Sequence, residues 1–302
     1  MSFDAEKAET NWEKDTIILG IDEAGRGPVM GPMVYACAYW KEEYDNDIRK
    51  KFKFNDSKAL KPEEREKMFE QIKSHPNIIR YELIILPSDY ISKEMLKREK
   101  VSLNQISQDS AKQLIKMARD KKVNVRKIYV DTVGPADSYK HLLEASLEDK
   151  EIKVTVEPKA DAKFECVSAA SIVAKVTRDK HIEIIEKEDK DCGSGYPSDP
   201  KTKEWLKNNY DNVFGFGREV RFSWKTVDSM FKENNNKCEW EDYDSEEESQ
   251  KNKKYKKGKK GKEEDDKNNL KIDILMPPDE NKNKNVVRNF YEKNDIDFKV
   301  DL

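Results

Sequence analysis

Short apolar runs alternate with amphipathic stretches along the first three quarters of the chain. "TIILGIDE", residues 16–23, has the continuous apolar character of a buried strand, and "MVYACAYW", residues 33–40, predicts its hairpin partner after a glycine-containing loop. A third strand is predicted in "IIRYELIILPSDYI", residues 78–91. "RKIYVDTVG", residues 126–134, and "EIKVTVEPKAD", residues 151–161, predict two more strands, each running into an acidic residue. The chain therefore begins with antiparallel strands.

Helical periodicity follows the third strand. In "SLNQISQDSAKQLIKMARDKK" the apolar residues fall mostly on one helical face. Further helices are predicted in "DSYKHLLEASL", "VSAASIVAKVTRDKHIEIIEKE", "KTKEWLKNNY" and "SWKTVDSMFKEN". Antiparallel strands that give way to alternating strands and helices indicate an α/β fold, a mixed β-sheet flanked by helices, with a C-terminal helical extension.

The composition changes after Cys238. The 302 residues are 36% hydrophobic, a low value for a chain that is packed throughout. From Glu239 onward, acidic and lysine-rich clusters follow one another, and such a segment buries too little apolar surface to offset its chain entropy. We predict an N-terminal arm over 1–14, a folded body over 15–238, a disordered charged linker over 239–285 and a short docking segment over 286–302.

Charge and cysteine content exclude few classes of protein. Residues 1–238 carry 43 acidic and 43 basic side chains, so the net charge of the body neither requires nor excludes a polyanionic partner. The four cysteines are far apart and have no zinc-site spacing, which favours reduced, mostly buried thiols. No apolar stretch reaches the roughly 20 residues of a membrane span, and the start lacks signal-peptide character. An intracellular, soluble protein without a membrane partner is expected.

Acidic residues stand at three of the predicted strand ends. They are Asp22 with Glu23, Asp131 and Asp161. Because the carboxyl ends of neighbouring strands converge on one edge of an α/β sheet, the sequence predicts one cluster. Two carboxylates about 4 Å apart repel by roughly 4 kcal/mol at an effective dielectric near 20, so bound cations are expected to stabilise the cluster. Carboxylate oxygens are ligands that favour Mg²⁺ or Mn²⁺. The alternative for any single acid is a turn or helix-cap residue.

The glycine-containing loop directly follows the first pair of acids. Gly25, Gly27 and Gly31 match neither a Walker loop, which needs a following Lys-Ser or Lys-Thr, nor the dinucleotide fingerprint, which opens a helix. Glycines still allow the backbone to approach a ligand closely, and Arg26 offers a fork of donors suited to a phosphate. The loop is therefore a candidate for binding a nucleic-acid backbone. The alternative is a tight hairpin loop with an exposed arginine.

Six motifs occur together and in order: "GIDEAGRGPVMGP", "NDSKAL", "YVDTVG", "KADAKFECVSAASIVAKVTRD", "GSGYPSDPKT" and "FGFGREVRFSW". Over about residues 15 to 240 they closely resemble type 2 ribonuclease H, and the C-terminal extension resembles that of the catalytic subunit of the eukaryotic heterotrimer. The resemblance implies the ribonuclease H fold. It also implies metal-dependent hydrolysis of RNA within RNA/DNA hybrids and a cut on the 5′ side of single ribonucleotides embedded in duplex DNA.

The resemblance also implies the roles of particular residues. Two Mg²⁺ or Mn²⁺ ions would be held by the strand-end acids Asp22, Glu23, Asp131 and Asp161, and would activate a water and stabilise the leaving 3′ oxygen. At "KFEC" the chain departs from relatives, which have an aromatic residue followed by proline, and this allows the loop after Asp161 a different path. The residues implied for substrate contact are Gly25, Arg26 and Gly27 at the ribose junction, Tyr196 against the next deoxynucleotide sugar, and Lys58 and Arg178 near the substrate backbone.

The resemblance further implies two accessory protein subunits, RNA/DNA hybrids and ribonucleotide-containing DNA as substrates, and a place in DNA replication and ribonucleotide repair in the nucleus, with the cytoplasm as a second location. Three alternatives stay open. An acid cluster on this fold also serves DNA-directed nucleases, a catalytically silent subunit could bind hybrids, and the charged tail could carry the main function. Only a ribonuclease requires the 2′-hydroxyl of its substrate.

Overall fold

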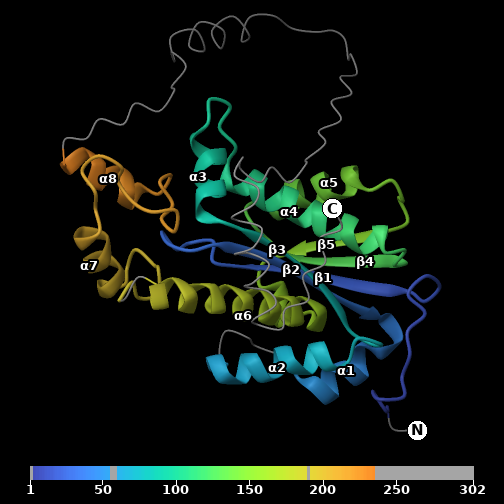
Figure 1. The fold of residues 1–302 in the computed structure, drawn as a ribbon. Coiled ribbons are helices and arrows are strands. Elements are labelled where there is room, and N and C mark those ends of the chain that lie inside the picture. The colour runs from blue at the N-terminus through green and yellow to red at the C-terminus, as the bar shows by residue number, and fades with distance from the viewer. Residues whose placement is uncertain (1–2, 55–59, 189–190, 235–302) are drawn as a thin grey trace, which may run out of the picture. The chain divides into compact units, whose positions relative to one another are not determined.

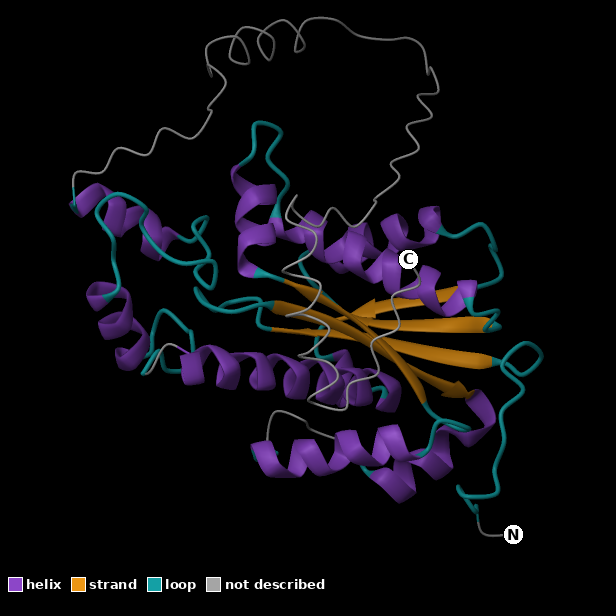
Figure 2. Ribbon diagram, in the orientation of Figure 1, coloured by secondary structure: helices purple, strands orange, loops and turns teal. Residues whose placement is uncertain are grey.

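A computed structural model describes residues 3–54, 60–188 and 191–234. The predicted linker over 239–285, the docking segment over 286–302 and Lys58 lie outside the described residues. The described part contains a five-stranded sheet in the order β3-β2-β1-β4-β5 (Figure 2). Its strands are β1 (Ile17–Ala24), β2 (Met33–Lys41), β3 (Arg80–Leu86), β4 (Val125–Asp131) and β5 (Lys153–Glu157). β1 pairs antiparallel with β2 and parallel with β4, so the predicted mixed sheet is confirmed.

Helices cover both faces of the sheet. The α-helices are α1 (Asp45–Phe52), α2 (Pro62–Ser74), α3 (Ser88–Leu96), α4 (Leu103–Asp120), α5 (Ala136–Ser146), α6 (Glu165–Glu188), α7 (Pro200–Asn208) and α8 (Lys225–Glu233), with short 3-10 turns η1 (Glu42–Tyr44) and η2 (Ala160–Ala162). Figure 1 shows α4 and α5 over one face of the sheet and the long α6 across the other, with α1 and α2 beyond α6.

The alternation of side chains along β1 explains the two layers. Ile17, Leu19 and Ile21 lie in a buried cluster with the apolar residues of α4 and α5. Ile18 and Ala24 lie in a second cluster with the small residues of α6. Because successive side chains of a strand point to opposite faces, an apolar run without alternation is what a strand buried on both sides requires.

Gly20 sets how closely α6 approaches β1. A Cβ atom at this position would lie 2.3 Å from the carbonyl carbon of Cys166 and 2.3 Å from the backbone nitrogen of Val167. Backbone atoms cannot give way as a flexible side chain does, so only glycine allows this contact. The first turn of α6 is thereby held against the middle of the central strand.

A third buried cluster joins the C-terminal extension to the loop after β1. Val29 and Met30 pack there with apolar residues of α7 and α8 and with Val220. Met30 and Val220 also form an isolated β-bridge. Segments nearly 200 residues apart in sequence thus lie side by side.

Several predicted boundaries were wrong, and each has a local cause. The third strand ends at Leu86, and Pro87 precedes α3, since proline favours the N-terminal boundary of a helix and interrupts strand pairing. β5 ends at Glu157, so Asp161 lies in the 3-10 turn η2 and not at a strand end. Helices α1 and α2 were not predicted from the sequence.

The start of the described chain packs onto the sheet. The Trp12 ring meets that of Tyr39 edge-on at 5.6 Å, and the Trp12 carbonyl accepts a hydrogen bond from the Asn124 N–H. Cys37, Cys166 and Cys192 are buried free thiols, as predicted. Within the described residues, none of the helices has the length and apolar character that a membrane span requires.

Candidate active site

Three aspartates meet on the α6 face of the sheet. Asp22 lies in β1, one residue beyond the Ile21–Val130 pair, and Asp131 ends the neighbouring parallel strand β4. Asp161 is held near them because the backbone N–H of Ala160 donates to the Asp131 Oδ1 atom at 3.0 Å. Asp22 and Asp161 are buried, and Asp131 is half-buried. The predicted convergence of these acids is seen in the structure, although Asp161 comes from a turn and not from a strand end.

Burial and mutual repulsion perturb the central carboxylate. The pKa of Asp22 is raised to about 7, mainly by burial and also by the charges of Asp131 and Asp161, while hydrogen bonds from the Ser171 side chain and the Glu23 N–H oppose the rise. The last of these bonds is 2.8 Å long. The Asp22 carboxylate is therefore poised between its two protonation states at neutral pH.

Glu23 faces the other side of the sheet. It follows Asp22 in the same strand, and the alternation of β1 turns its side chain toward the layer of α4 and α5. The structure pairs Glu23 with Tyr35 on β2, which lies in the buried cluster of that layer. The structure thus brings three of the four predicted acids together and places Glu23 at the same strand end on the opposite face.

The donor atoms of this group suit a hard divalent cation, since all are carboxylate oxygens. As they stand, no three His, Cys, Asp or Glu side chains in residues 3–54, 60–188 and 191–234 form a set that could hold a metal ion. Mg²⁺ characteristically takes one or two protein carboxylates and completes its shell with water and substrate phosphate oxygens. The aspartate group fits such a partial site, and a cation there would offset the repulsion that raises the Asp22 pKa.

The glycine loop, residues 25–31, is held by its carbonyl groups. Arg221 is fully buried, and its guanidinium donates to the carbonyls of Gly25 at 2.6 Å, Arg26 at 3.1 Å and Gly31 at 2.8 and 3.0 Å. The Trp224 indole N–H donates to the Gly27 carbonyl at 3.0 Å. Among the described residues, the backbone N–H groups of positions 25 to 27 have no acceptor. The segment 221–224 thus fixes the inner side of the loop and leaves its amide groups for another partner.

The side chain of Arg26 is already bonded within the protein. Its guanidinium donates to Ser107 Oγ at 2.5 Å and to Asn104 Oδ1, both on α4. In this structure the terminal nitrogens of the fork therefore bind α4. That Arg26 contacts a phosphate stays a prediction.

A second loop, residues 192–196, is hydrogen-bonded to the glycine loop. The Gly195 carbonyl accepts from the N–H groups of Val29 at 2.8 Å and Met30 at 3.2 Å. Tyr196 follows, with 42% of its surface exposed, and a Cβ atom on Gly27 would lie 3.4 Å from its ring. The two predicted substrate-contact elements thus lie in contact, as a site for one ligand requires.

Arg178 connects these loops from α6. Its guanidinium donates to the Ser194 carbonyl at 2.6 Å, pairs with Asp179 at 3.2 Å and lies 5.5 Å from the centre of the Tyr196 ring. Arg178 is only 8% exposed, and in this structure its guanidinium lies against Tyr196. Its contact with a substrate backbone stays a prediction. Ser171 precedes it on α6 by two helical turns, about 10 Å, and so one face of α6 spans from the acids to the loops.

The segment that contains Lys58 is outside the described residues, but its flank is fixed. The Phe54 N–H donates to Glu165 Oε1 at 2.7 Å, and the Phe54 carbonyl accepts from Ser168 Oγ. Both acceptor and donor belong to the first turn of α6. The helix that contacts Asp22 therefore also anchors the chain next to the predicted lysine.

Arg221, Trp224 and Ser171 were not predicted from the sequence. The motif "FGFGREVRFSW" contained the first two, and an arginine directly between valine and phenylalanine is the signal that could have identified a buried guanidinium. Ser171 sits in a helix whose small residues indicate close packing and no site. Its hydrogen bond to Asp22 depends on the approach of α6 that Gly20 permits.

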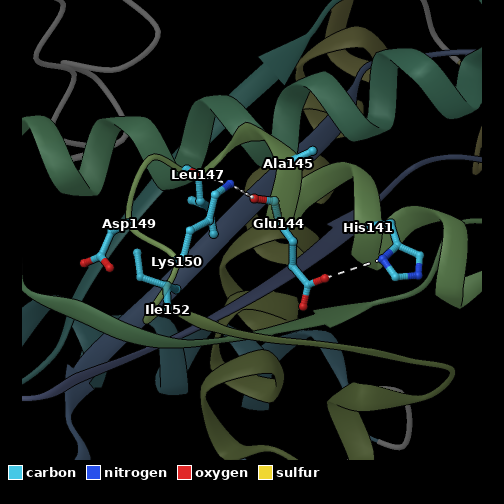
Figure 3. A pocket seen from close by; sticks show the side chains of 7 residues that line it. All are labelled: His141, Glu144, Ala145, Leu147, Asp149, Lys150 and Ile152. Atoms are coloured by element: carbon cyan, nitrogen blue, oxygen red, sulfur yellow. Dashed lines mark hydrogen bonds and ion pairs between the residues drawn. The ribbon is translucent and has the colours of Figure 1, made fainter.

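A hollow on the surface lies away from these residues. A surface hollow of about 340 Å³ lies at the end of α5, next to the loop that leads to β5 (Figure 3). There Lys150 donates to the carbonyls of Glu144 and Leu147, and His141 faces Glu144 at 3.6 Å. These contacts cap a helix end, and none of the predicted site residues lines the hollow.

Known proteins share this arrangement. Residues 19–227 match the family Ribonuclease HII. The A-type subunit of ribonuclease H2 from Mus musculus is 44% identical over 241 residues, which cover 78% of this chain and 79% of the mouse protein. The crystal structure of ribonuclease H2 from Pyrococcus horikoshii OT3 has a TM-score of 0.63 and 36% identity, covering 74% of this chain and all of that one. Bst-RNase HIII in complex with Mn²⁺ has a TM-score of 0.58 at 18% identity, covering 77% and 73%, and is similar in fold.

The fold is a mixed sheet with three aspartates gathered beside the carboxyl ends of its parallel strands, next to a glycine-containing loop. Together with these likenesses, it defines a ribonuclease H, a hydrolase of nucleic-acid phosphodiesters. The chain belongs to the ribonuclease HII family. The resemblance stated from the six sequence motifs is confirmed.

Proposed function

We propose that this chain is the catalytic subunit of an endoribonuclease that hydrolyses the RNA strand of RNA/DNA hybrids and cuts on the 5′ side of single ribonucleotides in duplex DNA. The main support for the proposal is that the acidic group and the glycine loop are adjacent in the chain. Asp22 belongs to the acidic group, and the glycine loop begins three residues later with backbone N–H groups that have no acceptor among the described residues. The acidic group suits phosphodiester cleavage, and the glycine loop suits recognition of the sugar beside the scissile phosphate.

The acids support hydrolysis. Two Mg²⁺ or Mn²⁺ ions, held by Asp22, Asp131 and Asp161 with Glu23 at the same strand end, would supply an activated water and stabilise the leaving 3′ oxygen, giving 3′-hydroxyl and 5′-phosphate ends. The chain itself fixes the carboxylates before substrate arrives. Ser171 orients the Asp22 carboxylate, and the Ala160 N–H orients that of Asp131. Such preorganisation limits the reorganisation required during reaction.

The loops support selection of ribose. A 2′-hydroxyl is both a donor and an acceptor, and it is the group that distinguishes RNA from DNA at a given position. The amide groups of Gly25 and Gly27 can approach such a hydroxyl because no Cβ atom stands in front of them. The exposed Tyr196 ring lies next to Gly27, where it would stack on the sugar of the following deoxynucleotide and reject a 2′-hydroxyl there.

The relatives suggest the context of the reaction. The mouse protein is named as one subunit of ribonuclease H2, which supports assembly of this chain with accessory subunits, two in the proposed heterotrimer. We place the enzyme in the nucleus, with the cytoplasm as a second location, where it would remove ribonucleotides and RNA primers during DNA replication and repair.

A panel of matched duplexes tests the proposed substrate. The purified full-length chain, alone and with candidate accessory subunits, is incubated with Mg²⁺ or EDTA and three duplexes of one sequence: all DNA, DNA with one ribonucleotide, and DNA with one 2′-O-methyl ribonucleotide. We expect cleavage of the second duplex alone, and only with Mg²⁺. Comparable cleavage of the all-DNA duplex would instead identify a DNA nuclease, and binding without cleavage under every condition would identify a catalytically silent subunit.

A further inference from the structure

Two tyrosine hydroxyls are buried without a hydrogen-bond partner beneath the end of β1. Tyr35 and Tyr139 are each 1% exposed, and neither hydroxyl oxygen has a partner among the described residues. A hydroxyl that loses water and gains nothing in exchange costs free energy, so most buried polar groups in native proteins are hydrogen-bonded. Two such groups in one place therefore suggest a function that is not realised in the resting structure.

The register of the sheet places one of them against Glu23. Tyr35 on β2 is the residue directly opposite Glu23 on β1, and opposite residues of an antiparallel pair have side chains on the same face with Cβ atoms about 5 Å apart. Tyr139 comes from α5, which covers that same face. The charge of Glu23 raises the pKa of both hydroxyls after the larger effect of burial, as expected of a carboxylate close to both.

Two neighbouring polar groups of this layer already make hydrogen bonds. Ser107 on α4 lies near Tyr35 and lowers the pKa of its hydroxyl, and the Ser107 hydroxyl donates to the Leu103 carbonyl at 2.8 Å and accepts from Arg26 at 2.5 Å. Arg26 is a donor only, so it cannot accept a proton from a phenol. The carboxylate of Glu23 is an acceptor with lone pairs for several donors, so it can accept from both phenols.

We propose that Tyr35 and Tyr139 are positioning residues for Glu23, whose carboxylate receives hydrogen bonds from their hydroxyls, directly or through one water molecule, when cations and substrate draw it into place. The inference rests on the proposed function, in which Glu23 is one of the four acids. Glu23 alone of the four lies on the α4 and α5 face, and these phenols are donors in that layer that can help to fix its orientation. Partners of this kind, one step removed from the metal, commonly change metal affinity or activity by 10- to 100-fold when they are removed.

Tyr35→Phe and Tyr139→Phe remove only the hydroxyls, and Tyr39→Phe is a matched control. Tyr39 lies on the same strand and face as Tyr35, but its hydroxyl donates to Glu82 at 2.9 Å, away from Glu23. Four quantities are measured on the full-length chain, assembled with accessory subunits where the wild type requires them. They are the Tm in EDTA, the Mn²⁺ dissociation constant by calorimetry, and the kcat and KM for a duplex with one ribonucleotide.

We expect both Tyr35→Phe and Tyr139→Phe to keep or raise the Tm, because they delete an unpaired buried hydroxyl. Both should weaken Mn²⁺ binding and lower kcat by about 10-fold, with KM unchanged. Tyr39→Phe should lower the Tm and leave Mn²⁺ binding unchanged. In a Glu23→Gln background, the Tyr35→Phe change should no longer affect Mn²⁺ binding.

Wild-type Mn²⁺ binding and kcat in both tyrosine variants would overturn the inference. A lower Tm with unchanged Mn²⁺ binding would do the same, since it would show that the hydroxyls serve stability alone. If the wild-type chain fails to cleave the duplex under every condition, the proposed function fails instead, and calorimetry on the folded variants still decides whether the hydroxyls act on Glu23.

Discussion

Replacement of Arg221 by methionine tests how the glycine loop is held. The side chain is fully buried, and its four hydrogen bonds satisfy the carbonyls of Gly25, Arg26 and Gly31. Methionine fills a similar volume without any donor. A lysine at this position retains the charge but cannot reproduce the planar fork, so Arg221→Lys should give a smaller defect of the same kind.

The loss of stability expected for Arg221→Met follows from the three carbonyls that lose their donor. A buried acceptor that loses its donor costs about 1–3 kcal/mol, so the three together cost roughly 3–9 kcal/mol. Removal of the guanidinium relieves part of this cost, because burial and the nearby charge of Arg178 lower the Arg221 pKa to about 9. We therefore expect the lower end, about 3 kcal/mol, which corresponds to a fall in Tm of roughly 6–12 °C for a body of this size.

The assay combines thermal unfolding with cleavage of a duplex that carries one ribonucleotide. Arg221→Met should lower the Tm and, at a temperature where it stays folded, lose cleavage of this duplex because the loop amides are no longer fixed. Arg218→Met is the matched control, since Arg218 lies three residues away and is exposed. A methionine variant with the Tm and the cleavage rate of the wild type would refute the idea that Arg221 holds the loop.

Three more predictions concern the acids, the packing of α6 and the tyrosine. The folded-state pKa of Asp22 is raised to about 7 from 3.8, so ionisation of Asp22 destabilises the folded state as the pH rises through this range. In EDTA, Asp22→Asn should therefore raise the free energy of unfolding by up to about 4 kcal/mol at pH 8 and by almost nothing near pH 4. An equal gain at both pH values would contradict this. Gly20→Ala should destabilise the protein by at least about 2 kcal/mol in chemical denaturation, since its Cβ atom would lie 2.3 Å from backbone, and an unchanged midpoint would show that α6 can move away. Tyr196→Ala should reduce cleavage at a single embedded ribonucleotide more than cleavage of a long hybrid, and equal losses would remove its role at the junction.

The strands and most of the helices could be predicted because hydrophobic periodicity reports burial directly. The meeting of Asp22 with Asp131 was also predictable, since parallel strands end at one edge. The α1 and α2 helices were not, although α1 buries Ile48 and Phe52, and α2 buries Phe69 and Ile72, at helical spacing. Their position depends on tertiary packing, which local sequence patterns do not encode.

The details of the site depended on contacts between distant segments. Alternation along β1 could have separated Asp22 from Glu23 at the outset, but their position at one strand end suggested a single cluster. The contacts that Arg26 makes in the structure could not be predicted, because its acceptors, Asn104 and Ser107, are about 80 residues away in sequence. Arg221 binds the loop across an even longer separation, and no local pattern indicates which carbonyls a buried guanidinium will reach.

The most direct test of the central claim maps the cleavage position on a duplex with one ribonucleotide, using the wild type and Asp131→Asn. We expect the wild type, with Mg²⁺, to cut only at the phosphodiester on the 5′ side of the ribonucleotide and to leave a 3′-hydroxyl. The Asp131→Asn variant should fold with a Tm close to that of the wild type and produce no cut. A variant that cleaves at the wild-type rate, or a wild type that cuts this duplex at unrelated positions, would contradict the claim that these aspartates and the adjoining loop form a ribonucleotide-specific active site.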